Sequence, residues 1–177
     1  MSITIRKSIP NDVYGIREVQ RTTWLNTYPN FEEGISLKDI ESNFENDKTP
    51  EGKIQIESRK KYYEDKNVCT WVVEDENKII GFCGATKKED FNRVGAVYVL
   101  PDYQDQGLGK LLIQKALNWL GNDKNILINV ANYNTKAINF YKSFGFIESK
   151  KIINPTDFHK LPSGKIIPEI ELIKVLL

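Results

Sequence analysis

Residues 97–110 read Val-Tyr-Val-Leu-Pro-Asp-Tyr-Gln-Asp-Gln-Gly-Leu-Gly-Lys. The apolar start is typical of a buried strand, and the leucines after Gly107 recur with helical spacing. Gly107 and Gly109 therefore lie where a helix begins, although glycine costs about 0.5–1 kcal/mol relative to alanine inside a helix. A bound anion would explain two glycines at this position, because the free amides and the dipole of a helix N-terminus attract negative charge. A turn that only tightens the strand–helix connection is the alternative.

Two familiar phosphate-binding loops do not fit this turn. A P-loop requires glycine at position 104 and serine or threonine at position 111, where this chain has Gln104 and Leu111. A dinucleotide-binding loop requires a third glycine at position 112, which is Leu112.

The pattern of elements around the turn predicts a mixed α/β sheet with helices on both faces, in a single domain covering residues 3–177. Pro29 is expected to interrupt the first helix, and residues 30–66 are expected to form one or two further helices with an intervening loop. The predicted strands lie at residues 3–5, 68–74, 78–86, 94–100, 126–130, 146–153 and 167–175, and the other helices at 10–28, between Pro101 and Gly121, and at 134–144.

Composition narrows the function classes. The chain has 177 residues and a net charge of +1, which gives no overall attraction to nucleic acid or to an anionic membrane. Cys69 and Cys83 lie in apolar stretches without metal-type spacing, so we expect two reduced core thiols and no metal. The N-terminus lacks the apolar core of a secretory signal, and we expect a cytoplasmic protein.

A second pattern occupies residues 134–146. Ala137, Phe140, Tyr141 and Phe144 share one helix face, and Asn134 is suited to cap that helix. A capped amphipathic helix whose tyrosine packs in the core explains this pattern without any ligand.

Both patterns together resemble a known family. Gln104-x-x-Gly107-x-Gly109 after a strand ending in Val-x-Pro resembles motif A of the GNAT superfamily of N-acetyltransferases, and residues 134–146 match its second signature, Asn-x-x-Ala-x-x-x-Tyr-x-x-x-Gly-Phe. The resemblance implies about six to seven strands, with two of them splayed to form a slot for coenzyme A. It also implies transfer of an acetyl group from acetyl-coenzyme A to an amine. Gly95 is compatible with the strand bulge that the family has near this slot.

The resemblance also implies roles for individual residues. The amides of residues 105–110 would bind the diphosphate of coenzyme A, the backbone of residues 97–99 would bind its pantetheine arm, and Asn134 would contact the pantetheine or phosphate region. Tyr141 would act on the thiol leaving group as the catalytic residue, and the amide near Val99 would polarise the thioester oxygen. The complete set of implied cofactor residues is Val97, Tyr98, Val99, Gln104, Asp105, Gln106, Gly107, Leu108, Gly109, Lys110, Asn134 and Tyr141.

No general base follows from the resemblance. Residues 93–99 contain no acid, and the corresponding position on the next strand is Asn129. Deprotonation of the amine through water to an acid, or through a tyrosine, stays open, and we expect His159 to be a solvated loop residue. The open choices are Glu32, Glu33, Asp39, Tyr28 and Tyr98.

The acceptor site in this family is built from segments that correspond to residues 24–47 and 158–168. Trp24 and Tyr28 offer aromatic surface there, and Glu32 and Glu33 offer negative charge. A polyamine would use both, and a peptide or protein amine is the alternative; the acids also suit a solvated helix face.

Two other function classes compete with the enzyme. A non-catalytic acyl-coenzyme A-binding regulatory module would account for the missing carboxylate, whereas the retained Tyr141 opposes it. Action on transfer RNA would need a basic surface, and the near-neutral charge opposes it. The expected partners are acetyl-coenzyme A and an amine, with a homodimer left open.

Overall fold

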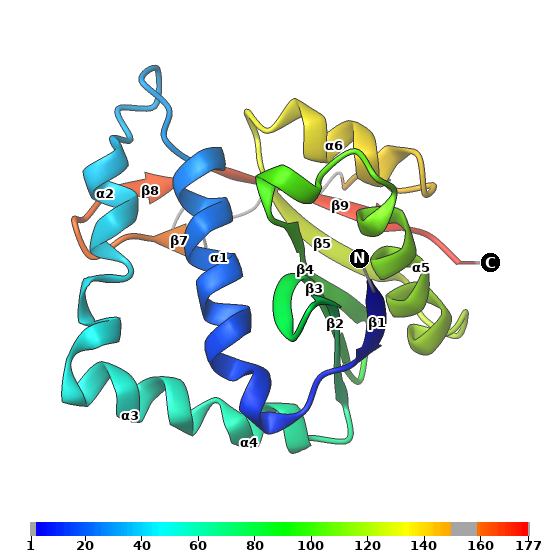
Figure 1. Cartoon of the computed structure of the whole chain (residues 1–177). Coiled ribbons are helices and arrows are strands. Elements are labelled where there is room, and N and C mark those ends of the chain that lie inside the picture. Colours follow the sequence, from blue (N-terminus) through cyan, green and yellow to red (C-terminus); the bar gives the residue numbers. More distant parts are fainter. Residues whose placement is uncertain (1–2, 150–158, 177) are drawn as a thin grey trace.

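A mixed β-sheet forms the centre of the molecule (Figure 1). The computed structural model describes residues 3–149 and 159–176. Within them, the seven strands of the main sheet follow the order β1-β2-β3-β4-β5-β9-β6, and β7 and β8 form a separate hairpin. The strands are β1 (Thr4–Lys7), β2 (Val68–Asp75), β3 (Lys78–Lys87), β4 (Asn92–Val99), β5 (Ile126–Ala131), β6 (Ile147–Glu148), β7 (His159–Lys160), β8 (Ile166–Ile167) and β9 (Glu169–Lys174).

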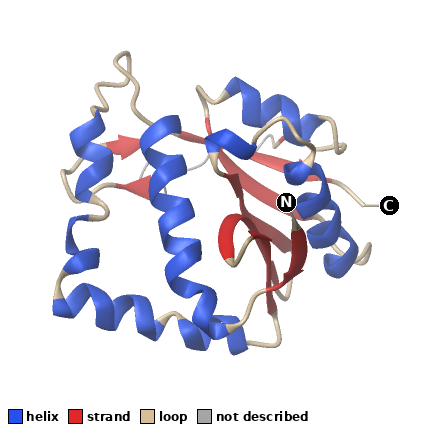
Figure 2. Cartoon of the chain, in the orientation of Figure 1, coloured by secondary structure: helices blue, strands red, loops and turns tan. Residues whose placement is uncertain are grey.

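The helices flank this sheet (Figure 2). The α-helices are α1 (Val13–Thr27), α2 (Leu37–Ser42), α3 (Pro50–Ser58), α4 (Lys60–Glu64), α5 (Leu108–Leu120) and α6 (Thr135–Lys142), and short 3-10 helices lie at η1 (Pro10–Asp12), η2 (Glu45–Lys48) and η3 (Pro101–Tyr103).

The segment 30–66 is more helical than the predicted one or two helices, because it holds α2, α3, α4 and η2. Local capping explains the extra helices. The Ser36 hydroxyl accepts a hydrogen bond from the Asp39 amide, and Thr49 accepts one from the Gly52 amide at the start of α3. These caps stabilise short helices whose polar composition gives little periodic signal.

Consecutive residues of β4 locate helices on both faces of the sheet, as predicted. The Tyr98 hydroxyl accepts a 3.0 Å hydrogen bond from the Trp24 indole of α1. The neighbouring Val97 side chain instead faces Gly109 of α5. Because adjacent strand residues point to opposite faces, α1 and α5 cover opposite faces.

A bulge in β4 and a splayed strand pair shape the middle of the sheet. Gly84 of β3 pairs with Ala96, and Ala85 pairs with Val94, so Gly95 is the extra residue. In the described chain, β4 and β5 pair in parallel at two positions, beginning at Asn92, and then diverge. The expected bulge and slot are both confirmed.

The end of the chain differs from the prediction. Of the strand expected at residues 146–153, the structure assigns Ile147–Glu148 to β6, and residues 150–153 lie outside the described residues. The last strand is the shorter β9, and the β7–β8 hairpin precedes it without having been expected. Cys69 and Cys83 are buried free thiols, as predicted.

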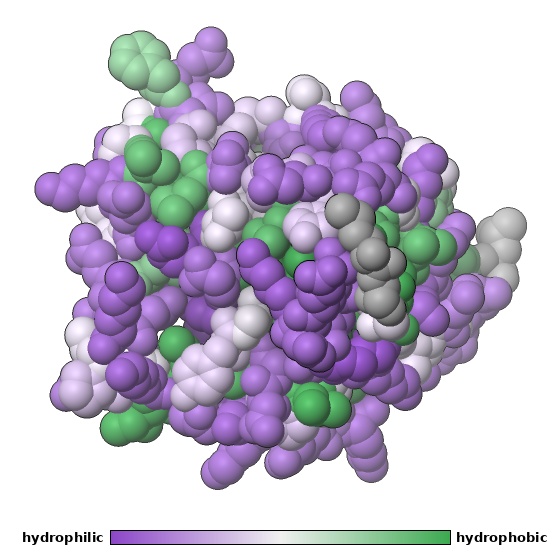
Figure 3. All heavy atoms as spheres, viewed as in Figure 1, coloured by the Kyte–Doolittle hydropathy of each residue, from purple (hydrophilic) through white to green (hydrophobic). Residues whose placement is uncertain are grey.

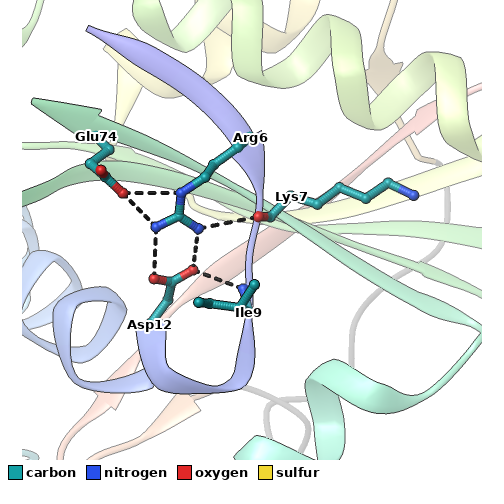
Figure 4. Close-up of polar contacts among 5 residues, drawn as sticks. All are labelled: Arg6, Lys7, Ile9, Asp12 and Glu74. Atoms are coloured by element: carbon teal, nitrogen blue, oxygen red, sulfur yellow. Dashed lines mark hydrogen bonds and ion pairs between the residues drawn. The ribbon is translucent and has the colours of Figure 1, made fainter. Parts of the chain in front are cut away.

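An ion-pair cluster ties β1 to the start of α1 (Figure 4). The Arg6 guanidinium donates hydrogen bonds of 2.6 and 2.9 Å to the Asp12 carboxylate, and its Nε donates one of 3.0 Å to Glu74 of β2. The Ile9 amide also donates to Asp12, at 2.8 Å. This cluster fixes the edge of the sheet from which α1 departs.

The face seen in Figure 3 is mostly hydrophilic, and its hydrophobic atoms form small separate groups. No helix within residues 3–149 and 159–176 combines the length and the apolarity needed to cross a bilayer.

Candidate functional site

The turn between β4 and α5 presents a row of free backbone amides. Within the described residues, the amides of residues 105–110 donate no hydrogen bond, and Leu111 is the first to do so, to the Gly107 carbonyl at 3.2 Å. Asp105 and Gly107 have positive φ angles of 60° and 82°. Alternation of such residues with ordinary ones gathers successive N–H groups into a concave anion site, here at the positive end of α5.

A cavity of about 990 Å³ opens over this turn. Its lining brings together nearly all of the predicted cofactor residues: Val97, Tyr98, Val99, Gln104, Asp105, Gln106, Gly107, Gly109, Lys110, Asn134 and Tyr141. Leu108 does not line it, because its side chain is buried in the core; only its amide is available to a ligand. A Cβ built on Gly107 meets nothing within 4 Å. The space beside this turn therefore suits a diphosphate that approaches the backbone closely.

Gln104 braces the turn rather than extending freely into the cavity. Its side-chain amide donates a 3.0 Å hydrogen bond to the Val99 carbonyl, which fixes the turn to the end of β4. Lys136 of α6 lies 3.4 Å from the Asp105 carboxylate, and both side chains are largely exposed. These two opposite charges lie beside the free amides and largely offset each other, so the backbone amides themselves form the anion site.

The second sequence pattern lies on the other side of the same cavity. Asn134 caps α6, since its Oδ1 accepts a 3.0 Å hydrogen bond from the Ala137 amide. Tyr141 is buried, and its ring lies edge-on to Phe140. Burial above all, and then Cys83 and Tyr98, raise the pKa of the Tyr141 hydroxyl well above its usual value of 10, while the Val97 amide opposes the shift. The phenol therefore stays protonated near neutral pH and is available as a hydrogen-bond donor.

A smaller cavity of about 290 Å³ adjoins the large one. The two cavities share five lining residues, Tyr28, Gly95, Ala96, Tyr98 and Asn129, and so meet at the β4 bulge. Trp24, Arg17, Arg59, Arg93, His159 and Glu169 line the small cavity alone. The splayed strands thus connect a long slot to a compact chamber.

Glu169 is the acid that sequence reasoning missed. It is the first residue of β9, is partly buried, and accepts a 3.1 Å hydrogen bond from the Asn129 side chain across the sheet. Burial raises the pKa of its carboxyl above the ordinary 4.5, although Asn129 and Arg93 oppose the rise. Pro168 before the strand is the only local signal, and it does not indicate a role in a site.

A hydroxyl network lies at the junction of the cavities. The Tyr98 hydroxyl accepts the Trp24 indole hydrogen bond and lies 2.8 Å from the Tyr28 hydroxyl. Burial raises the pKa of both phenols, and the neighbouring Tyr98 raises the pKa of Tyr28 further. Trp24 and Tyr28, predicted as acceptor residues, therefore both border the small cavity.

Other predicted acceptor residues lie elsewhere. Glu32 and Glu33 lie in the exposed loop before α2 and line neither cavity. His159 is not the solvated loop residue that was expected, because it belongs to β7 and packs edge-on against Trp24, with ring centroids 4.8 Å apart. Burial, and secondly Arg17, lower its pKa below 6.5, and within the described residues its Nε2 is buried without a partner. Phe158, where the predicted acceptor segment begins, lies outside the described residues.

Comparison with known proteins gives this geometry a family context. The sequence model of the Acetyltransferase (GNAT) family matches residues 35–146. The peptidyl-lysine N-acetyltransferase YjaB of Salmonella typhimurium is 33% identical over 104 residues, which cover 58% of this chain and 63% of that protein. An uncharacterized N-acetyltransferase, ycf52 of Gracilaria tenuistipitata, is 31% identical over 135 residues, which cover 72% of this chain and 70% of that protein.

Solved structures share the fold over the whole chain. The PaiA N-acetyltransferase of Thermoplasma acidophilum, crystallised in complex with coenzyme A, superposes with a TM-score of 0.72 and 21% identity over 99% of both chains. An acetyltransferase from Streptococcus pneumoniae gives a TM-score of 0.64 with 18% identity over 99% of this chain and 100% of that one.

Proposed function

This chain belongs to the acetyltransferase (GNAT) family, and we propose that it transfers an acetyl group from acetyl-coenzyme A to the nitrogen of a primary amine. One observation carries the proposal. The free amides of residues 105–110, the unpaired edge of β4 and the Tyr141 side chain all border one cavity. An anion site, an extended backbone edge and a hydrogen-bond donor therefore border the same slot.

Each part of acetyl-coenzyme A would have a matching group among the residues of this cavity. The amides beside Gly107 and Gly109 would hold the diphosphate. The edge of β4 that faces the splayed β5 would hydrogen-bond the amide-containing pantetheine arm in the manner of an added strand. The bound group supplies a thioester whose carbonyl accepts the amine and whose thiolate leaves, and the amide near Val99 would polarise its oxygen.

Glu169 is proposed as the group that removes a proton from the attacking amine. A primary ammonium with a pKa near 10.4 must lose a proton before it can attack. The partly buried carboxylate lies in the chamber that meets the slot at Asn129, and its raised pKa makes it a better proton acceptor than an exposed glutamate. The Asn129 side chain holds the carboxylate in place.

Tyr141 is proposed as the donor to the leaving thiolate. Its pKa is raised by burial, so the hydroxyl keeps its proton until charge develops on sulfur. A thiol pKa near 8.5 lies below that of the phenol, so Tyr141 supports departure mainly by hydrogen bonding.

The acceptor belongs to the primary amines, either a small molecule such as a polyamine or the amine of a peptide or protein. The name of the Salmonella relative specifies peptidyl-lysine, which places protein lysine among the candidates. A cytoplasmic location is proposed with this function.

Measurement of thiol release from acetyl-coenzyme A in the presence of separate amines tests the proposal. The panel contains spermidine, a lysine peptide, and short alkylamines with and without a carboxylate. We expect amine-dependent release together with a matching acetylated product. Binding of acetyl-coenzyme A without release for any amine would instead identify a non-catalytic acyl-coenzyme A-binding module.

A further inference from the structure

The charges that line the small cavity do not balance one another. Arg17, Arg59 and Arg93 all line it, whereas Glu169 is its only lining acid among the described residues. Two of these arginines have acidic partners outside the lining, whereas the third has none among the residues that the structure describes. The partners therefore decide which charges are left for a ligand.

Arg17 and Arg93 are already neutralised. The Arg17 guanidinium donates hydrogen bonds of 2.8 and 3.0 Å to Asp47. Arg93 donates one of 3.1 Å to the Asn129 oxygen and lies 3.9 Å from the Glu171 carboxylate. Neither guanidinium needs a ligand to satisfy its charge.

Arg59 is different, because its side chain makes no hydrogen bond or ion pair within residues 3–149 and 159–176. It lies between α3 and α4 at the open rim of the cavity, where much of the side chain is exposed. Partial burial and the positive charge of Arg17 disfavour its charged form and outweigh the opposing effects of Tyr63 and Asp47, so an anion bound there would favour the charged form. A guanidinium binds a carboxylate with two parallel hydrogen bonds.

Glu169 is the second group without an ion pair among the described residues. It accepts a hydrogen bond from Asn129 and is attracted by the Arg93 charge, but Arg93 forms its ion pair with Glu171. The chamber thus has one spare positive charge at its rim and one spare negative charge near the thioester slot.

We infer that the acceptor is a small amino carboxylate, whose amine lies at Glu169 and whose carboxylate lies at Arg59. This inference rests on the proposed acetyl transfer and specifies the substrate class of the same site. Such a zwitterion neutralises both spare charges at once. A polyamine would bring further positive charges beside three arginines and would leave Arg59 without a partner. An alkylamine would leave it unpaired as well.

Matched acceptors that differ only at the end distant from the amine test this inference. 5-Aminopentanoate, pentylamine and cadaverine have the same carbon chain and end in a carboxylate, a methyl group and an ammonium. Glycine to 6-aminohexanoate, each against the alkylamine of equal length, extends the series. Because a hydrogen-bonded charge pair contributes roughly 10- to 100-fold to affinity, kcat/KM for the best carboxylate should exceed that of its alkylamine by a similar factor.

Arg59→Gln should reduce the ratio of kcat/KM for the carboxylate to kcat/KM for the alkylamine to about one. It should do so by raising the KM for the carboxylate while kcat changes little. Arg59→Lys should keep part of it, because lysine retains the charge but not the paired geometry. Arg21→Gln is the matched control, because Arg21 lies on α1 outside the lining of both cavities and should leave the preference intact.

The outcomes separate the two proposals. If no amine releases thiol although acetyl-coenzyme A binds, the proposed function fails. If amines are acetylated but cadaverine or pentylamine equals the carboxylates, or if Arg59→Gln keeps the preference, the acetyl transfer survives and the amino carboxylate is wrong.

Discussion

The Asn129 side-chain amide of β5 donates a 3.1 Å hydrogen bond to the Glu169 carboxylate of β9, and its oxygen accepts one of 3.1 Å from Arg93 of β4. Three strands therefore contribute side chains to one hydrogen-bonded chain at the junction of the two cavities. The orientation of the Asn129 amide is set by its two partners, since a donor and an acceptor cannot be exchanged without losing both bonds. Asn129 therefore orients the Glu169 carboxylate, which we propose as the general base.

Glu169→Gln should lower kcat/KM by about 10²-fold or more, the usual contribution of a general base. The wild-type enzyme should lose activity as the pH falls through the raised pKa of Glu169, which lies above 4.5, and the variant should lack this limb. Steady-state rates between pH 5 and 9 measure both effects. Glu148→Gln, at an exposed ion pair with Lys142, is the control and should behave as wild type.

The stability of the same variant separates catalysis from structure. Because the pKa of Glu169 is raised in the folded protein, its charged form is disfavoured there, and the neutral glutamine should keep or raise the melting temperature. Loss of activity together with loss of the fold would contradict the assignment, as would full activity at every pH.

Tyr141→Phe should lower kcat by something like 10²-fold and leave the affinity for acetyl-coenzyme A nearly unchanged. The substitution removes a hydroxyl and keeps the ring that packs on Phe140. Calorimetry gives the affinity, and single-turnover rates show whether chemistry limits kcat. Unchanged single-turnover rates would restrict Tyr141 to packing.

Substitutions at Gly109 should block the cofactor in proportion to their size. A Cβ there lies 3.7 Å from the Phe140 ring, an ordinary contact, and Gly109 needs no positive φ, so Gly109→Ala should fold and bind with modest loss. Gly109→Leu extends into the cavity and should abolish binding by calorimetry. Gly107 is a poorer test, because its φ of 82° would strain any other residue. Equal affinity for the alanine and leucine variants would exclude this turn as the diphosphate site.

Asp12→Asn should destabilise the protein by roughly 1–3 kcal/mol at pH 7 without changing kcat. Burial opposes ionisation of Asp12, but the Arg6 and Ile9 hydrogen bonds outweigh it and hold the pKa below 3.8. The stabilisation is therefore present above the unfolded pKa of about 3.9 and is lost as the pH falls through the lower folded value. Urea unfolding at pH 7 and pH 3 should give a smaller difference between wild type and variant at pH 3. A difference that stays constant would assign the cluster no ionic role.

The slot could be predicted from the sequence, whereas the lining of the small cavity could not. The turn at Gly107, the Asn134 cap and the bulge at Gly95 are local features, since each depends on a few neighbouring residues. Glu169 and Arg59 meet in one cavity only because distant elements pack together, and nothing beside either residue marks it. The sequence also did not show that Glu32 lies in an exposed loop and lines neither cavity, because charge along the chain does not show which way a loop faces.

The extra residue in β4 acts as a change of phase along the strand. Before it, Asn92 reaches the α5 side through its hydrogen bond to the Leu120 carbonyl, and Arg93 faces the chamber. Before the extra residue the odd-numbered Arg93 faces the chamber, and after it the even-numbered Tyr98 does so. No substitution reproduces or cancels this inversion; only a change in length does. Deleting Gly95 would make Ala96 follow Val94 directly, opposite Gly84 and Ala85, so ordinary alternation would return, the Tyr98 side chain would keep its face, and only the irregularity in the strand would be lost.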